Sequence, residues 1–232
     1  MIEKNQEKKV DVSFVLPCLN ESRTLKKVIE RCHEAGKYLG SYEIVIADNM
    51  SQDNSAAIAK KEKAKVIKVR EKGYGSAINA GIKKSKGTYV VMGDADNTYD
   101  FMDSIKMIKI LKQFKCDLVI GNRFRGHIEN GAMPFLHRYL GNPFLSALGK
   151  ILYLVNINDF HCGIRAFKRE SIIKLELNTT GMEFASEMII RCSLANYKIK
   201  ETSVNLKKGI KGRIPHIKTW RDGWRHLKFL LT

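Results

Sequence analysis

The sequence contains little cysteine and no long apolar segment. Its five cysteines are scattered and odd in number, and they form no Cys-x-x-Cys pair. This arrangement argues against a disulfide framework or a zinc site and favours a reducing compartment. A membrane-spanning helix needs about 20 consecutive apolar residues, and the sequence has no such run. The first residues are polar and charged with no apolar stretch behind them, so we expect no signal peptide.

Acidic residues are scarce relative to basic ones. The 232 residues include 41 Lys and Arg but only 24 Asp and Glu, which gives a net charge of +17. Such a balance favours an anionic partner, which can be nucleic acid, an anionic membrane or a phosphorylated ligand. The apolar fraction of 44% is ordinary for a globular protein with a sizeable core.

Two carboxylates follow a short apolar stretch in the middle of the chain. Residues 89–92 form a β-branched, strand-like run, and Asp94 and Asp96 come directly after it. Residues two apart on an extended backbone point the same way, so these carboxylates would lie together. Like charges that close repel each other unless a cation lies between them, and Mg²⁺ and Mn²⁺ prefer carboxylate oxygen. This stretch alone predicts either a metal site or a solvated acidic turn.

Strand-like and helix-like segments alternate through the first half of the chain. We expect strands at 10–16, 41–47, 64–69, 89–92 and 117–121, separated by helices at 21–39, 53–63, 73–86 and 101–114. We expect Pro17 to stop the first strand, and Asn20 or Ser22 to cap the first helix. This alternation is typical of βαβ units and of an α/β fold with a mainly parallel sheet.

Ligands of such sheets bind beyond the carboxyl ends of the strands. The polar turns at those ends should therefore converge on one rim. They contain Asn20, Glu21, Asp48, Asn49, residues 70–75, Asp94, Asp96 and Arg123.

The second half of the chain has a different pattern. A mostly apolar helical stretch at 133–156 is interrupted at 141–143. A turn with a short strand (159–168), a helix (182–196), an antiparallel-type strand (197–204), a basic loop (206–214) and an amphipathic helix (217–232) are expected to follow. In the last helix an apolar stripe lies beside basic residues; it contains Trp220, Trp224, Leu227 and Leu231, beside Arg221, Arg225 and Lys228. We expect residues 1–9 to be a disordered basic lead-in and residues 10–216 to form one domain.

Several motifs, in order, resemble the family 2 glycosyltransferases with the GT-A fold. They are Val15-Leu-Pro17-Cys-Leu-Asn20-Glu21, Ile46-Ala-Asp48-Asn49 with Ser51 and Asp53, Gly73-x-Gly75, and Asp94-Ala-Asp96. Asp159-x-x-Cys162-Gly163-Ile-Arg165 and Trp220-Arg-Asp-Gly223 are similar to the subgroup that contains dolichol-phosphate mannose synthase and bacterial polyprenyl-phosphate glucosyltransferases. The resemblance covers about residues 11–230. Met50 departs from it, because glycine is usual there, and so does Asn97, where leucine is common.

The resemblance implies a metal-dependent, inverting hexosyltransferase. Its donor would be a nucleotide-diphosphate sugar of the UDP-glucose or GDP-mannose class, and its acceptor a polyprenyl phosphate such as undecaprenyl or dolichyl phosphate. Mg²⁺ or Mn²⁺ would be the cofactor, and the enzyme would act in cell-envelope glycan synthesis as a peripheral protein on the cytoplasmic face of the membrane. Residues 133–156 and the C-terminal helix would then be interfacial elements, or would serve core packing or self-association instead.

The resemblance also implies roles for individual residues. The nucleotide-sugar site would comprise Pro17, Asn20, Glu21, Asp48, Gly73, Gly75 and Asp94. Asp96 with Asp94 would hold the metal, and the acceptor phosphate would bind Arg123, Arg138 and Arg213, because guanidinium forks suit phosphate oxygens. Asp159 would contact the donor sugar or orient the attacking phosphate, so the catalytic set is Asp94, Asp96, Asp159 and Arg123. Glu187 is a further candidate to face the site, and His161 is interpreted as structural.

Two other functions stay open on the sequence. The same fold acting on a soluble or glycan acceptor would need a general base, which Asp159 or Glu187 would have to supply. A phosphate acceptor does not, since its second pKa of about 6 leaves it anionic at neutral pH. A basic nucleic-acid-binding module is supported by net charge alone, and no recognised motif for it is present. We therefore expect no nucleic-acid partner.

Overall fold

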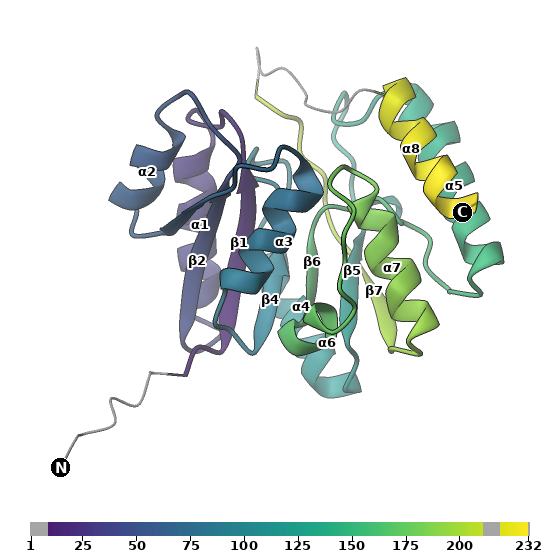
Figure 1. Cartoon of the computed structure of the whole chain (residues 1–232), viewed down its shortest axis with the longest axis horizontal. Helices are drawn as coiled ribbons and strands as arrows, with labels where there is room; N and C mark the ends of the chain where they lie inside the picture. The colour runs from purple at the N-terminus through teal and green to yellow at the C-terminus, as the bar shows by residue number, and fades with distance from the viewer. Residues whose placement is uncertain (1–8, 211–218, 232) are drawn as a thin grey trace.

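A seven-stranded sheet forms the centre of the computed structural model, which describes residues 9–210 and 219–231 (Figure 1). The strands are β1 Val12–Cys18, β2 Tyr42–Asp48, β3 Lys65–Lys68, β4 Tyr89–Met92, β5 Leu118–Asn122, β6 Arg165–Lys168 and β7 Ile199–Ser203. Their order across the sheet is β3-β2-β1-β4-β6-β5-β7. The mainly parallel α/β sheet predicted from the sequence is confirmed.

One strand direction was predicted wrongly. The sequence pattern indicated an antiparallel-type strand at 197–204, but β7 pairs parallel with β5. The antiparallel strand is β6, which pairs in that sense with both β4 and β5. The reason lies in the connections. β6 runs down the sheet between two strands that run up, and helix α7 carries the chain back to the original direction at the edge.

The helices cover both faces of the sheet (Figure 1). They are α1 Leu25–Gly36, α2 Ser55–Lys61, α3 Tyr74–Lys84, α4 Asp103–Phe114, α5 Asn142–Leu152, α6 Arg169–Ile173, α7 Phe184–Leu194 and α8 Thr219–Leu231, with short turns η1 Arg123–Arg125 and η2 His137–Gly141. The side chain of Phe14 meets Phe101, which precedes α4, whereas its neighbour Val15 faces Gly81 of α3. α1 and α4 thus share one face, and α3 and α7 the other. The short helix α6 was not predicted.

Strand β1 continues through Pro17, which was expected to end it. Pro17 pairs with Ala47 and Cys18 with Asp48 in the register of β2. On the other side of β1, the pairing with β4 ends at Val15. The missing N–H of Pro17 falls on this open side, where the ladder needs no donor. β1 therefore extends past the last residue that pairs with β4, and its exit turn begins after Cys18.

Helix α1 begins at Leu25, later than the predicted start at residue 21. Its N-cap is Thr24, and no side chain caps it. Neither Asn20 nor Ser22 acts as the expected cap. The Asn20 side chain accepts from the Gln52 amide, and the Ser22 amide donates to Asp53 in the turn after β2. Tertiary hydrogen bonds have taken the place of local capping.

The apolar stretch of the second half forms a single helical segment with a change of winding. Residues His137–Gly141 are wound as a π-helix, and α5 follows without a break. Pro143 lies where the π-helical turns pass into α5, so the expected interruption is a change of pitch. α8 packs beside α5 (Figure 1), and the Tyr153 hydroxyl donates to the Leu230 carbonyl at 3.0 Å.

The two faces of α8 differ from one another. His226 and Leu230 are buried, whereas Trp224 and Leu231 of the predicted apolar stripe are 67% and 63% exposed. No helix within the described residues is long and apolar enough to cross a bilayer. The side chain of Trp220 and the residues from 211 to 218 lie outside the description.

A fully buried arginine joins the sheet to the loop before it and to α7. The Arg165 guanidinium donates to the carbonyls of Cys162 (3.0 Å), Phe160 (2.7 Å) and Ala185 (2.7 Å). Burial lowers the pKa of Arg165 from its ordinary value, and nearby groups such as Tyr74 and Cys162 oppose that effect. The buried guanidinium is therefore compensated by hydrogen bonds to these three carbonyls.

We predict that Arg165→Met lowers the free energy of unfolding by about 3 kcal/mol or more, because three buried carbonyls lose their donor. Arg191→Met on the exposed side of α7 is the control and should change it by less than about 0.5 kcal/mol. Urea denaturation followed by circular dichroism measures both. Equal stability of the two variants would contradict the anchoring role.

Candidate active site

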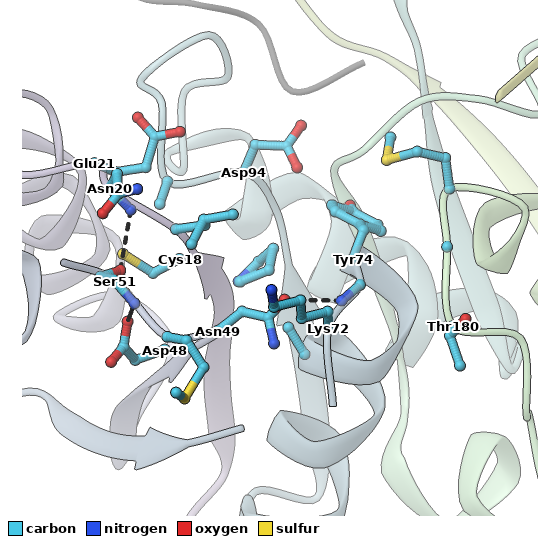
Figure 2. A pocket seen from close by; sticks show the side chains of 18 of the residues that line it. Cys18, Asn20, Glu21, Asp48, Asn49, Ser51, Lys72, Tyr74, Asp94 and Thr180 are labelled. Carbon is cyan, nitrogen blue, oxygen red and sulfur yellow. Dashed lines mark hydrogen bonds between the residues drawn. The ribbon is translucent and has the colours of Figure 1, made fainter. Parts of the chain in front are cut away.

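A cavity of about 910 Å³ lies beyond the carboxyl ends of β1, β2 and β4. Its walls come from the turns after these strands, from the start of α3 and from the segment that begins at Thr180 (Figure 2). Helix α8 adds Arg221 and Arg225. It is lined by Pro17, Cys18, Leu19, Asn20, Glu21, Asp48, Asn49, Met50, Ser51, Gln52, Lys68, Lys72, Gly73, Tyr74, Ala77, Asp94, Ala95, Asp96, Thr180, Gly181, Met182, Arg221 and Arg225. The rim expected from the strand ends is thus a real concavity.

Most residues predicted to bind a nucleotide sugar or a metal meet in this cavity. Seven of them line it: Pro17, Asn20, Glu21, Asp48, Gly73, Asp94 and Asp96. Gly75 does not line the cavity but is buried just behind its wall. The structure brings these side chains together, while their individual roles stay predictions.

Hydrogen bonds join the turn after β1 to the turn after β2. The Asn20 amide donates to Ser51 Oγ at 3.0 Å, and the Gln52 amide donates to the side-chain oxygen of Asn20 at 2.8 Å. The Glu21 amide donates to Ser55 Oγ at 2.9 Å. These bonds hold Asn20 in the left-handed region, at φ 55°. Glu21 is thereby fixed at the mouth of the cavity, where Figure 2 shows it beside Asn20.

Asp48 and Asp53 stabilise the second turn. Asp48 accepts from the Ser51 amide at 3.0 Å and is 6% exposed. Asp53 accepts from the amides of Ser22 (3.0 Å) and Ser55 (2.9 Å). Partial burial raises the pKa of Asp53, but the hydrogen bonds from Ser55 and Ser22 outweigh it and lower the pKa to about 2. Asp53 is therefore an ionised anchor of the turn that presents Asp48.

The two carboxylates after β4 have different surroundings. Asp96 accepts from the amide and the hydroxyl of Thr98, at 3.0 and 2.6 Å, which closes a tight turn. Asp94 lies against the backbone of Gly163, where a Cβ would come within 2.6 Å of its carboxylate. Burial and the neighbouring Asp94, which shares a hydrogen bond with Tyr74, raise the pKa of Tyr74 well above its ordinary value. Asp94 therefore faces a neutral phenol.

The two glycines at the start of α3 make room for another segment of the chain. A Cβ on Gly73 would lie 2.0 Å from the Thr180 carbonyl oxygen, and one on Gly75 would lie 2.2 Å from that of Thr179. The amides of Gly75 and Ser76 donate to the Thr180 carbonyl at 2.9 and 3.3 Å. The close backbone approach expected at these glycines is thus made by residues 179–180.

Arg123 and Asp159 are paired with each other, away from the cavity lining. The Arg123 guanidinium donates to both oxygens of Asp159 at 2.7 and 2.6 Å, and the Arg123 amide donates to the same carboxylate at 3.0 Å. Burial lowers the pKa of Arg123, but the Asp159 charge outweighs it and raises that pKa well above its ordinary value. The ion pair is bidentate and buried, and the guanidinium and the carboxylate are each other's hydrogen-bond partners.

The other predicted phosphate-binding arginines also lie elsewhere. Arg138 is on η2 with its guanidinium 5.4 Å from the ring centre of Tyr139, and it does not line the cavity. Arg213 lies outside the described residues. Glu187 is fully buried behind the cavity wall and bonds residues 178–179.

Two arginines of α8 line the cavity and were missed as site residues. Arg221 and Arg225 are one helical turn apart, and Arg225 forms an ion pair with Glu183 of the loop before α7. The sequence showed their basic character beside an apolar stripe. It could not show that this side of α8 turns toward the strand ends.

A pair of histidines, the half-buried His161 and the buried His226, ties α8 to the turn before β6. The rings of His161 and His226 are 4.5 Å apart, edge to face, and His226 Nδ1 lies 2.9 Å from Ser186 Oγ. Both ring nitrogens of His161 are buried without a hydrogen-bond partner. Burial lowers the pKa of His161 well below its ordinary value, and the charges of His226 and Arg123 add to the effect. His161 is therefore neutral in the folded protein, in agreement with a structural role.

The chain is similar in sequence to known glycosyltransferases. The family model described as "Glycosyl transferase family 2" matches residues 13–176. The chain belongs to glycosyl transferase family 2. Among curated relatives, the chain is 36% identical over 221 residues to "Low-salt glycan biosynthesis hexosyltransferase Agl6" of Haloferax volcanii, covering 95% of this chain and 53% of that protein. It is 29% identical over 195 residues to the "Dolichyl-phosphate hexose transferase" of the same organism, covering 84% of this chain and 82% of that protein.

A third relative and a solved structure extend the likeness. The "Dolichol-phosphate mannosyltransferase" of Pyrococcus furiosus is 30% identical over 189 residues, covering 78% of this chain and 52% of that protein. The chain thus spans about half the length of some curated relatives. Glucosyl-3-phosphoglycerate synthase from Mycobacterium tuberculosis, solved with Mn²⁺, UDP and phosphoglyceric acid, superposes with a TM-score of 0.75 at 21% identity, covering 96% of this chain and 78% of that one. This likeness confirms the GT-A-type fold.

We predict a fall in stability at acidic pH that comes from His161. The unfolded chain protonates this histidine below its ordinary pKa of about 6.5, and the folded chain does not. The free energy of unfolding should therefore decrease as the pH falls below that value, by up to about 1.4 kcal/mol per pH unit for this one proton.

Urea unfolding at several pH values compares the parent with His161→Phe. The variant should lose stability less steeply on acidification, whereas His127→Gln on the exposed surface should keep the parent slope. Identical slopes in the parent and His161→Phe would contradict the assignment.

Proposed function

We propose that this protein transfers a hexose from a nucleotide-diphosphate sugar to a polyprenyl phosphate at a membrane surface, with inversion at the anomeric carbon. The observation that carries the proposal is the cavity at the strand ends, which has carboxylates on one wall and cations on another. The UDP-glucose and GDP-mannose classes of donor both agree with it. The names of the relatives, which include dolichyl-phosphate hexose transferase, support the acceptor.

The nucleoside end of the donor fits the wall built from the turns after β1 and β2. Asp48 and Glu21 are buried carboxylates at the lining, and each can accept a hydrogen bond from a base N–H or a ribose hydroxyl. Their turns are fixed by the bonds between residues 20–22 and 51–55. A preformed wall of this kind reduces the ordering cost of binding. The solved structure of similar fold that contains UDP supports a nucleotide ligand of this kind.

A divalent cation fits the residues after β4. Asp94 and Asp96 offer oxygen ligands at the lining, the type that Mg²⁺ and Mn²⁺ prefer. Within the described part of the chain no group of three or more His, Cys, Asp or Glu side chains converges, so a donor diphosphate would complete the coordination. When bound, the metal would act as a Lewis acid that neutralises charge on the leaving diphosphate. Lys72, Arg221 and Arg225 line the same cavity and add positive charge for phosphate groups.

The acceptor assignment agrees with the state of the candidate bases. A soluble hydroxyl acceptor would need a free carboxylate as general base. Asp159 is bound bidentately by Arg123, and Glu187 accepts from residues 178 and 179. A phosphate monoester is already anionic, so placement and charge screening suffice for its attack. The roles of Arg123, Arg138 and Arg213 in holding the acceptor phosphate stay a proposal from the sequence, since Arg123 binds Asp159 and Arg138 does not line the cavity.

An exposed apolar face supports docking on a bilayer. It is formed by η2, which runs directly into α5, and by α5 and α8, which lie side by side at one end of the molecule (Figure 1). Its exposed members are Phe135, Leu136, Tyr139, Leu140, Phe144, Ile151, Leu152, Leu154, Trp224 and Leu231. Exposed apolar side chains gathered on neighbouring elements mark interaction sites. With basic residues around it, this face suits the interface of an anionic leaflet, with self-association as the competing use.

Transfer can be tested with UDP- and GDP-sugars, Mn²⁺ or Mg²⁺, and either a polyprenyl phosphate in vesicles or a soluble sugar acceptor. We expect metal-dependent transfer to the lipid phosphate. Product formation only with the soluble acceptor would favour the other acceptor class, and tight binding to duplex DNA without sugar-nucleotide turnover would favour the nucleic-acid-binding module.

We predict that Asp96→Asn lowers this transfer by about two to three orders of magnitude. The asparagine oxygen can still accept from Thr98, so the turn and the melting temperature should be retained while the metal ligand charge is lost. The control is Asp103→Asn on α4, which should transfer at the parent rate. Retained metal-dependent activity in Asp96→Asn would refute the metal assignment.

We predict that Phe144→Glu and Trp224→Glu each weaken binding to anionic phospholipid vesicles, because a charge on the apolar face has to leave the interface. Vesicle flotation measures the bound fraction. Phe114→Glu, a partly exposed position on α4 away from this face, is the matched control and should float as the parent does. An unchanged bound fraction in both test variants would exclude this docking face.

A further inference from the structure

A buried carboxylate on α7 is fully used in holding a loop. Glu187 is 0% exposed. It accepts from the Asn178 amide at 3.0 Å, from the Thr179 amide at 2.9 Å and from the Thr179 hydroxyl at 2.6 Å. A buried charge is costly unless several hydrogen bonds compensate it, and charge-assisted bonds of this kind are short and strong. The backbone at residues 178–179 is therefore tightly fixed by one side chain.

The fixed segment packs closely against the start of α3. We call this contact between residues 177–180 and α3 the seam. The carbonyl of Thr180 accepts from the Gly75 amide at 2.9 Å, and Asn79 donates to the Leu177 carbonyl at 2.7 Å. At Gly75 a Cβ would come within 2.2 Å of the Thr179 carbonyl oxygen. A shift of the loop by a few tenths of an ångström would therefore be felt by α3.

This seam runs through the wall of the candidate donor cavity. Lys72, Gly73 and Tyr74 line the cavity from the α3 side, and residues 180–182 line it from the loop side. In Figure 2 Thr180 lies across the cavity from Asp48, with Lys72 and Tyr74 between them. The width of the cavity thus depends on where the loop sits against α3.

We infer that Glu187 is a positioning residue of the donor cavity, which acts by fixing residues 178–179 so that the Thr180 carbonyl seats the start of α3. The inference rests on the proposed nucleotide-sugar site. A glutamine at this position would keep one acceptor oxygen but would turn an NH₂ group toward the amide of residue 178, and two donors repel each other. An apolar side chain here would leave the amides of Asn178 and Thr179 without an acceptor. The carboxylate therefore sets the position of this backbone segment.

The test measures the dissociation constants of UDP and GDP with Mn²⁺ by calorimetry on the full chain. We expect Glu187→Gln to raise the dissociation constant of the bound nucleotide about tenfold, the change that corresponds to one strong hydrogen bond. Ile190→Val on the same buried helix is the matched control; it should lower the melting midpoint but leave the dissociation constant within about twofold. Binding to vesicles should be unaffected in both.

A second variant attacks the same seam from its other side. Gly75→Ala places a methyl group against the Thr179 carbonyl and should weaken nucleotide binding to a similar extent. Because both changes displace one seam, the double variant should lose less affinity than the product of the single losses. Should Glu187→Gln fail to fold, Thr179→Val removes only the hydroxyl bond and should still raise the dissociation constant, whereas Thr179→Ser should restore it.

The outcomes separate the inference from the proposed function. Parent-like nucleotide affinity in a folded Glu187→Gln variant that has lost stability would overturn the positioning role and leave the donor site standing. Multiplicative losses in the double variant would also overturn it. A parent chain that binds neither nucleotide with Mn²⁺ would remove the proposed donor site, and the inference with it.

Discussion

The candidate site is built from loops, and backbone groups in buried loops must find hydrogen-bond partners. Side chains supply them here. Asn49 donates to the carbonyls of Val69 and Glu71 and accepts from the Gly73 amide, so one amide group closes the turn after β3. Glu201 of β7 accepts from the amides of residues 158 and 159. Together with Asp53 and Glu187, these side chains supply the hydrogen-bond partners that the irregular segments need.

The sequence predicted the residues at the strand ends, because the order of strands and helices determines where those ends meet. Alternating strands and helices required a mainly parallel sheet, and the polar residues after its strands had to meet at one edge. Asp48, Asp94 and Asp96 were found in this way. Predictions from local sequence, such as helix capping, failed where a side chain forms a hydrogen bond with a distant segment instead. The Asn20 side chain was expected to cap a helix and instead accepts from the Gln52 amide, and the short strand β7 carried no signal of its direction.

The sequence could not predict which charged groups would meet one another. Arg123 and Asp159 looked like two independent site residues, but their mutual bidentate bonds keep them out of the cavity lining. Arg225 lines the cavity because α8 packs near the loop before α7, where Arg225 forms an ion pair with Glu183. Such pairings depend on contacts between distant segments. Composition indicated the excess of positive charge but not the place where that charge would be used.

The seam between α3 and the Thr179-Thr180 segment also bears on how this sequence can vary. A glycine at position 75 is a requirement set by a carbonyl from a distant segment, since a Cβ there would lie 2.2 Å from it. Any heritable change at one side therefore needs a compensating change at the other. The two short stretches should vary jointly among homologous chains, and a designer who transplants the Gly-x-Gly turn into another scaffold has to carry the opposing segment with it.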